Sequence, residues 1–359
     1  MAAVVVIIVG YRNAGDIAEC LRALAHAKAD PTFEIFISEN GGTSGMDALI
    51  ARLDADDVII RLPDNPPVSA EKAERTFCYA LARPDGSPGI RAHVAQMTEN
   101  LGYAGGVNAW LRPLLAVPEW EAAWVLNPDT LPEPDALAEL SAHAKTRRKG
   151  MVGSCIVRTD QPDLVSTRGL AWNWLACRAE AIGRGADLSI EPDPEEIEAK
   201  LVSPSGASLY ITRALITSIG LMDERYFLYF EDLEWGERAR RLGMVGYAHR
   251  SRVPHKCGTT IGGTARRAAR SKLSVYLAAR NLILYERNKH VLRVPWAILT
   301  QTFFLAIYGA VGAFGNMAAG FGGLVAGVRG EVGRPEAFFK ANQYGDSIRG
   351  RLSRTDSGY

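Results

Sequence analysis

Short apolar runs alternate with amphipathic stretches along the first 150 residues. The run at 4–9 is β-branched and apolar on both faces, which is typical of a central parallel strand, and Gly10 ends it. Ile17, Leu21 and Leu24 then recur at helical spacing. Further strands are predicted at residues 33–38, 58–61, 92–97 and 123–126, with a helix at 134–147. This alternation predicts an α/β fold with a doubly wound sheet.

Ligands of doubly wound sheets bind beyond the carboxyl ends of the strands, so the loops after residues 9 and 38 are candidate binding sites. Residues 63–91 hold two turn-rich clusters, LPDNPP and ARPDGSPG, and are predicted to form an insertion or lid around a short helical piece. Residues 150–260 read as mixed structure, with strands near 151–157, 207–211 and 245–249 and a helix that carries Asp232.

The C-terminal part of the chain changes character. No charged residue occurs from Val294 to Val328, a stretch of ~35 residues where ~20 suffice to span a bilayer. Pro295 and Gly315 interrupt it. Three interpretations stay open: a membrane-embedded or in-plane hairpin, one spanning helix, or a buried core or oligomer helix. The segment before it has few acids and carries a basic stripe, either a solvated face or a contact to anionic lipid: Arg266, Arg267, Arg270, Lys272, Arg280, Arg287, Lys289 and Arg293.

Composition excludes some classes of function. The 41 basic and 40 acidic side chains nearly cancel, so no nucleic-acid partner is expected. The five cysteines form no CxxC pair, which argues for a reducing compartment and against a disulfide framework or zinc ribbon.

Two glycine- or proline-containing loops are candidates for binding charged ligands. In NPD at 127–129, a carboxylate directly after a strand can reach a hard divalent cation, although the tripeptide is also an ordinary turn. GYAGGVN at 102–108 permits close backbone approach and precedes a predicted helix whose amides would face an anion; a purely structural loop is the alternative.

The stretch MDERYFLYFEDLEW places acids behind a wall of aromatic residues. Glu231 and Asp232 fall in the first turn of a predicted helix, where the macrodipole favours the charged form. An ionised carboxylate suits a general base or a metal ligand. An acidic helix cap is the alternative interpretation. His255, after a short strand, is taken alone more typical of a structural histidine.

The order of these motifs resembles one family. Glu39-Asn40-Gly41, NLGYAGGVN, LNPD, GASLYITR, MDERYFLYFEDLEW and a downstream Pro254-His255 are similar to glycosyltransferase family 2, with the GT-A fold. The resemblance covers residues 3–260 and is strongest to the rhamnosyltransferase and galactofuranosyltransferase branch.

The resemblance implies roles for individual residues. Asp129, with His255, would bind Mg²⁺ or Mn²⁺ on the donor diphosphate, and Asn127 stands where the family motif has its first acid. Asp232 would be the catalytic base, and Glu231 would help to position the acceptor hydroxyl. The remaining donor-side residues would be Tyr11, Glu39, Asn100, Gly105, Gly106 and Asn108. The acceptor side would include Trp172, Trp174, Tyr229 and Glu234, although a buried-core role for the two tryptophans is equally compatible with the sequence.

The resulting expectation is a metal-dependent inverting enzyme that transfers a sugar from a dTDP- or UDP-sugar donor to a glycan or lipid-linked glycan, with rhamnose from dTDP-rhamnose as the expected case. It would act at the cytoplasmic face of the inner membrane. Residues 1–148 would form the donor half, 149–265 the acceptor half, and 266–359 a helical membrane-associating region. A sugar-nucleotide-forming nucleotidyltransferase and a non-catalytic membrane protein of the same fold are the alternatives. The oligomeric state stays open.

Overall fold

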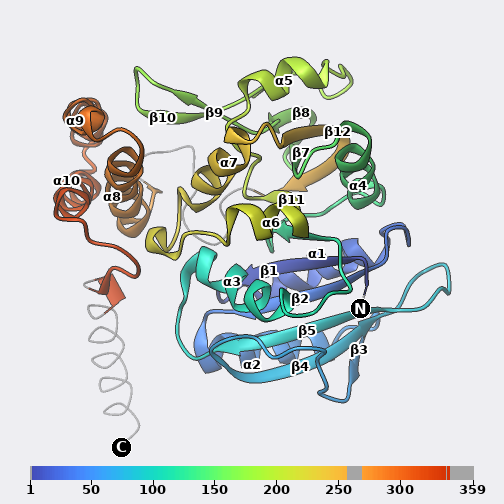
Figure 1. Cartoon of the computed structure of the whole chain (residues 1–359). Coiled ribbons are helices and arrows are strands. Elements are labelled where there is room, and N and C mark those ends of the chain that lie inside the picture. Colours follow the sequence, from blue (N-terminus) through green and yellow to red (C-terminus); the bar gives the residue numbers. More distant parts are fainter. Residues whose placement is uncertain (1, 257–268, 337, 340–359) are drawn as a thin grey trace, which may run out of the picture.

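The computed structural model describes residues 2–256, 269–336 and 338–339, and this part of the chain is built on one continuous mixed sheet of ten strands (Figure 1). The strand order is β12-β7-β11-β6-β1-β2-β5-β4-β3, and β8 pairs with β7 outside this path. The strands are β1 (Val4–Gly10), β2 (Phe33–Glu39), β3 (Ile59–Leu62), β4 (Ala73–Leu81), β5 (Ile90–Met97), β6 (Ala122–Leu126), β7 (Met151–Arg158), β8 (Gln161–Thr167), β11 (Ser208–Thr212) and β12 (Val245–His255).

Helices cover both faces of this sheet, as the doubly wound prediction requires. Successive side chains of β1 enter opposite cores: Val6 packs with α1, α2 and α4, whereas Ile7 packs with α3, α6 and α7. Burial on both faces explains why β1 and β6 read as uninterrupted apolar runs. The helices of this body are α1 (Ala14–Ala25), α2 (Gly42–Asp54), α3 (Gly102–Leu114), α4 (Ala136–Arg147), α5 (Pro194–Lys200), α6 (Arg213–Ile219) and α7 (Glu231–Arg241), with the 3₁₀ turn η1 (Glu224–Tyr226).

Strands β1, β2, β5 and β6 run parallel, and antiparallel strands flank them. β11 lies antiparallel between β6 and β7 and joins the two halves of the chain. The expectation for residues 63–91 was wrong: they contain no helical piece but the whole of β4, which pairs antiparallel with β5 inside the main sheet. A separate antiparallel hairpin consists of β9 (Leu170–Asn173) and β10 (Arg178–Ala181).

Three helices lie together at one flank of the sheet, next to α7 and the β9–β10 hairpin (Figure 1, orange to red). They are α8 (Lys272–Lys289), α9 (Val294–Ala310), which follows the 3₁₀ turn η3 (Val291–Arg293), and α10 (Phe314–Arg329). α10 packs closely along α8 because Gly323 and Gly327 let the two backbones approach. The uncharged segment therefore forms two helices with a break near Gly312.

The two apolar helices differ in their surroundings. Residues 291–310, which comprise η3 and α9, form a helix long and apolar enough to cross a membrane, with a mean hydropathy of 1.4 and only 17% of the window buried. Leu292 is 92% exposed. α10 instead has one side against α8. The predicted C-terminal hydrophobic helices are thus present.

The basic stripe is not one exposed face. Arg280 is only 1% exposed, and the Lys289 side chain is buried against Glu237, 3.2 Å from its carboxylate. Arg287 donates to the carbonyl oxygen of Gly327 at 3.0 Å. Arg266 and Arg267 lie outside the described residues. The interpretation of these cations as one lipid-facing stripe is corrected: several of them tie helices together.

Candidate active site

The loop after β2 holds the start of α3 in place. The Asn40 side-chain amide donates to the Gly102 carbonyl at 2.9 Å, and its oxygen accepts from the Leu101 N–H at 3.3 Å. The Ser38 hydroxyl donates to the Gly106 carbonyl at 2.7 Å. Two of the predicted motifs, the Glu39-Asn40-Gly41 loop and GYAGGVN, therefore meet at the carboxyl edge of the sheet.

Glu39 is fully buried beneath these loops. Its Oε1 accepts from the backbone N–H groups of Arg12, at 3.0 Å, and Gly41, at 2.7 Å. Its Oε2 has no hydrogen-bond partner among the residues that the structure describes. Burial raises the pKa of this carboxyl, opposed by the two backbone donors. A buried acceptor of this kind suits an N–H or O–H donor on a ligand.

The glycines of α3 serve close packing. Gly102 has φ +73°, and a Cβ there would lie 2.2 Å from the Phe227 carbonyl oxygen. A Cβ at Gly106 would lie 2.7 Å from Val9, and one at Gly105 would lie 2.8 Å from Leu101. Protein atoms occupy the space in which a Cβ at Gly105 or Gly106 would lie, and the contact of these glycines with the donor sugar or diphosphate stays a prediction.

Asn108 is also committed to the protein. Its amide donates to the Met222 carbonyl at 2.9 Å and to Glu224 Oε1 at 2.8 Å, while its oxygen accepts from the Met222 N–H at 3.2 Å. The side chain fastens α3 to the segment before η1. Its observed contacts indicate a positioning role in place of the predicted donor contact.

Asp129 and His255 face each other from two different strands. Asp129 follows β6 and His255 ends β12, and Asp129 Oδ1 lies 3.0 Å from His255 Nε2. Backbone bonds fix this pair: Thr130 forms a bridge with His255, and the Lys256 N–H donates to the Asp129 carbonyl at 3.1 Å. Asn127, half-buried at the end of β6, lies beside them in the chain.

This pair fits two adjacent ligands of one divalent cation. Metal–ligand distances of ~2.1 Å at right angles put neighbouring ligand atoms ~3 Å apart, which matches the separation of Asp129 Oδ1 and His255 Nε2. Within the described ranges, no third His, Cys, Asp or Glu completes a cluster. Asp129 and His255 would supply one carboxylate and one imidazole to such a cation, and oxygen atoms of a ligand or of water would fill the other coordination positions.

Glu231 and Asp232 are the first two residues of α7 and directly follow a strained aromatic segment, residues 226–230. Phe227, Tyr229 and Phe230 have φ of 64°, 70° and 78°, a left-handed conformation that is costly for bulky side chains. Asp232 Oδ2 accepts from the Gly206 N–H at 3.1 Å, and Oδ1 from the Leu233 N–H at 2.8 Å. The predicted position in the first turn of a helix is confirmed.

The predicted effect of the helix dipole on these acids is overridden by burial. Glu231 is buried, and its Oε2 has no partner within the described part of the chain. Burial raises its pKa, and the neighbouring charge of Asp232 raises it further, to about 8. Burial also raises the pKa of Asp232, against its backbone hydrogen bonds. The loss of hydration raises the free energy of the ionised carboxylates by more than the helix N-terminus lowers it.

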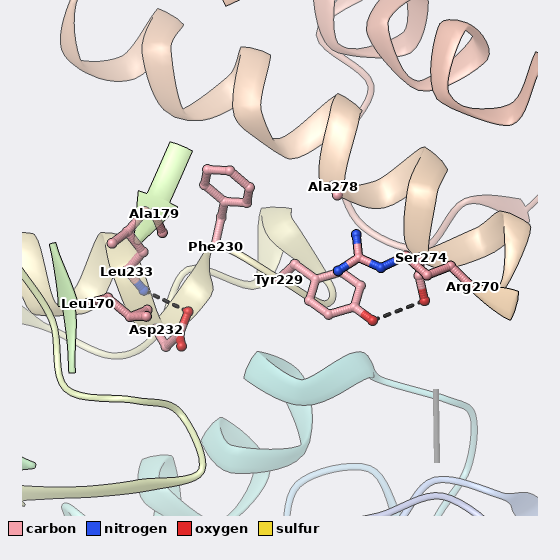
Figure 2. A pocket seen from close by; sticks show the side chains of 9 residues that line it. All are labelled: Leu170, Ala179, Tyr229, Phe230, Asp232, Leu233, Arg270, Ser274 and Ala278. Atoms are coloured by element: carbon pink, nitrogen blue, oxygen red, sulfur yellow. Dashed lines mark hydrogen bonds between the residues drawn. The ribbon is translucent and has the colours of Figure 1, made fainter. Parts of the chain in front are cut away.

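Asp232 lines a cavity of about 310 Å³ (Figure 2). Figure 2 shows Asp232 at one side and Arg270 and Ser274 of the α8 end at the other, with Tyr229 between them. The Tyr229 hydroxyl donates to Ser274 Oγ at 3.0 Å. The walls are otherwise apolar: Leu170, Ala179, Phe230, Leu233 and Ala278.

Tyr103 links the side of the site that holds Asp232 with the side that holds the Asp129–His255 pair. Its hydroxyl donates to the Gly206 carbonyl at 2.7 Å, and the N–H of Gly206 binds Asp232. Burial raises the pKa of Tyr103, and the carboxylates of Glu231, Asp232 and Asp129 raise it further. The charges of Asp129 and of the Glu231–Asp232 pair, which are far apart in the chain, therefore act on one phenol.

Comparison with known proteins identifies the family. The family model described as "Glycosyltransferase like family 2" matches residues 2–274. The chain belongs to glycosyltransferase family 2. This confirms the resemblance drawn from the motifs.

Similar proteins carry related names. This family 2 protein is 27% identical over 213 residues, 55% of its own length and 67% of the other's, to the N-acetylglucosaminyl-diphospho-decaprenol L-rhamnosyltransferase of Mycobacterium tuberculosis. It is 25% identical over 150 residues to the low-salt glycan biosynthesis hexosyltransferase Agl10 of Haloferax volcanii, a match spanning 42% of this chain and less than half, 46%, of that relative.

A solved structure shares the fold of this family 2 protein. The mannosyltransferase PcManGT from Pyrobaculum calidifontis, in complex with GDP-Man and Mn²⁺, superposes with a TM-score of 0.50 at 14% identity, over 91% of this chain and 87% of that one. The predicted GT-A fold is confirmed.

The other acceptor-side residues predicted from the family 2 resemblance are dispersed. Tyr229 lines the cavity. Trp172 is buried, with its ring 4.9 Å from that of Tyr285, so the buried-core alternative describes its contacts. Trp174 is 42% exposed and lies under Arg293, 4.8 Å from its ring centroid, in a second surface hollow. Glu234 pairs with Arg238 at 2.8 Å.

The remaining donor-side residues lie near the carboxyl edge. Tyr11 follows β1 partly exposed, and Asn100 Oδ1 accepts from the Gly102 N–H at 3.0 Å. Sequence reasoning assigned no role to Gly206, Tyr103 or Asn40, although all three lie within the quoted motifs of the family 2 resemblance. Their signal was present, but only the structure shows which neighbours they hold.

Proposed function

We propose that this protein transfers a sugar from a nucleotide-sugar donor to a hydroxyl group of a glycan or lipid-linked glycan, with inversion at the anomeric carbon. One observation carries the proposal: the loop at Gly206 joins the two sides of the site. The Asn127 N–H, at the end of the strand that leads to Asp129, donates to the Ala207 carbonyl at 3.0 Å, and the neighbouring Gly206 N–H donates to Asp232, which lines a cavity. A donor diphosphate held by Asp129 and His255 would thus have a base on a neighbouring segment.

The donor side needs charge neutralisation, because a nucleoside diphosphate leaves as the anomeric C–O bond breaks. Asp129 and His255 would hold a Mg²⁺ or Mn²⁺ ion, which when bound neutralises charge on the diphosphate. The unpartnered Oε2 of Glu39 would accept from the base or ribose of the nucleotide. Tyr11 and Asn127 lie on the same edge of the sheet and would contact the donor.

The acceptor side needs a proton acceptor. An acceptor oxygen forms a bond to the anomeric carbon as the diphosphate leaves, and its proton passes to Asp232. The raised pKa makes Asp232 a stronger base once it is ionised. The apolar walls and Tyr229 offer surfaces on which a sugar ring can pack. Inversion in a single displacement requires one such carboxylate.

Rhamnose from dTDP-rhamnose is the proposed donor sugar, and a lipid-linked glycan the proposed acceptor. Support comes from the mycobacterial relative, which is named as a rhamnosyltransferase acting on a diphospho-decaprenol. The cavity is partly walled by α8, which packs against the apolar C-terminal helices. An acceptor anchored in lipid would reach Asp232 from that side.

Attachment to the cytoplasmic face of the inner membrane is proposed through α9. Its exposed side chains include Trp296, Leu299 and Phe303, which would be costly to leave in water as one continuous surface. Trp174 and Leu175 at the tip of the β9–β10 hairpin adjoin this surface, where the Trp296 indole N–H donates to the Leu175 carbonyl at 2.9 Å. Tryptophan is typical of the membrane–water interface.

The catalytic proposal is tested with the full chain in detergent. Thermal unfolding with Mn²⁺ and a series of nucleotide sugars should show a rise in Tm for the true donor, and transfer should stop on addition of EDTA. Asp129→Asn should abolish both the rise in Tm and the transfer of sugar. Asp135→Asn should change neither, because Asp135 is a half-exposed aspartate that is ion-paired with Lys28. Transfer that survives EDTA and Asp129→Asn would rule out the metal role.

The membrane proposal is tested by flotation with vesicles containing anionic phospholipid. Leu299→Ser combined with Phe303→Ser should reduce the bound fraction, because the exposed apolar face is lost. Ile60→Ser is the matched control, since Ile60 is an equally exposed aliphatic side chain on β3. Equal binding of both variants would mean that α9 is not the attachment surface.

A further inference from the structure

Helix α8 carries two polar side chains that are sealed inside the protein. Arg280 is 1% exposed and Asn281 is 0% exposed. Burying a guanidinium and an amide is costly unless their donors are paired. Their partners therefore indicate what these residues hold.

The partners are carbonyl groups of the aromatic segment, residues 226–230. The Asn281 amide lies 2.9 Å from the carbonyl oxygen of Tyr226 and 2.8 Å from those of Leu228 and Tyr229. The Arg280 guanidinium donates to the Tyr226 carbonyl at 2.9 Å and to Asn281 Oδ1 at 2.9 Å. The Tyr103 N–H donates to the Phe227 carbonyl at 2.7 Å, and the Glu234 N–H donates to the Phe230 carbonyl at 2.9 Å.

The aromatic segment needs such support. Three of its five residues, Phe227, Tyr229 and Phe230, have positive φ, which is unfavourable for non-glycine residues. The Phe230 carbonyl accepts from the Glu234 N–H of α7, whereas the carbonyls of residues 226–229 depend on side-chain and loop donors. A strained conformation of this kind persists only where the surroundings impose it.

We propose that Asn281, oriented by Arg280, is a positioning residue that holds the aromatic segment and thereby aims the Glu231–Asp232 pair at the start of α7. The consequence of this orientation for catalysis rests on the proposed function. The Asn281 side chain does not line the cavity and is not bonded to Asp129 or His255, so it acts through the backbone carbonyls that it binds. Arg280 also donates to the Gly333 carbonyl at 2.7 Å, and the Gly333 N–H donates to the Arg225 carbonyl, which extends the support beyond α10.

Two variants and a matched control test this role. Asn281→Leu keeps the size of the side chain but removes every donor that Asn281 supplies to the segment. Asn281→Asp keeps an acceptor for the Arg280 Nε–H but places oxygen against the three carbonyls. Arg287→Gln removes an arginine on the same helix that donates to the carbonyls of Gly327 and Val328, and leaves the aromatic segment alone.

The expected result is a split between the two kinetic constants. A displaced base lowers kcat by about 10- to 100-fold, whereas KM for the nucleotide sugar stays within about twofold because the donor side is not touched. Arg287→Gln should lower Tm without changing kcat. If folded Asn281→Leu keeps the kcat of the wild type, or if Arg287→Gln loses kcat equally, the positioning role is wrong.

Backbone amide exchange provides a readout that does not need catalysis. In Asn281→Leu, exchange should rise in residues 226–233 and stay at wild-type rates in β1 and β6. A uniform rise throughout the sheet would overturn the proposal, because it would show only global destabilisation. If the wild-type chain transfers no sugar while this local rise is seen, the proposed function fails and the support of the segment by Asn281 stands.

Discussion

Replacing Asp232 by asparagine tests the assignment of the base, and the structure sets two separate magnitudes. Removal of a general base typically costs 10²–10⁴ in rate, or about 2.7–5.5 kcal/mol of transition-state stabilisation. The substitution also has a structural cost. Both carboxylate oxygens accept a backbone N–H, from Gly206 and Leu233, so the new NH₂ group faces an N–H donor in either orientation. One lost acceptor costs about 1–3 kcal/mol of stability.

The assay separates these two effects. Transfer rate at saturating donor and acceptor gives kcat, thermal unfolding gives the stability change, and titration with nucleotide sugar gives the donor Kd. We expect kcat to fall at least about 100-fold. The donor Kd should not change, because the proposed role of Asp232 is to accept the proton of the acceptor and not to bind the donor.

A matched control is available on the same helix. Glu234→Gln also converts an acid to an amide, but Glu234 pairs with Arg238 and does not line the cavity, so kcat should stay close to wild type. A folded Asp232→Asn enzyme that binds donor normally and loses less than about tenfold in kcat would refute the assignment.

Three further predictions concern single residues. Burial raises the pKa of Glu231 in the folded state from its ordinary value of 4.5 to about 8. The stability that this protonation contributes is fully present below about pH 4.5 and is lost as pH rises to about 8. Glu231→Gln should therefore flatten the decline of Tm between about pH 4.5 and 8, and an unchanged decline would mean that ionisation of Glu231 does not cause it. Gly206→Ala would place a Cβ 2.8 Å from Asp232 Oδ2, so transfer assays should show a fall in kcat of about tenfold or more with donor Kd retained, and a normal kcat would show that the carboxylate is not held there. Gly323→Val would set a Cβ 2.2 Å from a backbone oxygen of α8, so thermal unfolding should show a loss of stability of about 1–3 kcal/mol. The control Gly322→Ala, whose Cβ would meet only atoms 3.8 Å away, should show little change. Equal stability of the two variants would mean that α10 does not pack against α8 as described.

The central sheet was predictable because its strands are buried on both faces. β1 and β6 carry unbroken apolar runs, and their predicted and observed bounds agree within two residues. β4 was missed because it is partly exposed and reads AERTFCYAL, with polar residues at irregular positions between two turn-rich clusters. Its strand identity comes from its pairing with β5, a tertiary effect that no local pattern records.

The site was predictable only as far as residue type indicates chemistry. An acid after a strand and acids behind aromatics indicated Asp129 and Asp232, and the charges of both raise the pKa of the same tyrosine, Tyr103. The raised pKa of Glu231 was not predictable, because its largest cause is burial, which only tertiary packing sets. Asn281 sits in a helix that looks like part of a membrane-associating region, and nothing in its local sequence points to the carbonyls that it binds.

The place of β11 limits how this molecule can move. Because β11 is hydrogen-bonded to β6 on one side and to β7 on the other, the strand that leads to Asp129 and the strands behind the acceptor cavity share a single hydrogen-bonded ladder. Opening by rotation of two lobes would break that ladder. If the proposed function holds, we expect substrates to enter and leave through the segments around the rim of the sheet, with the separation between the Asp129–His255 pair and Asp232 kept constant.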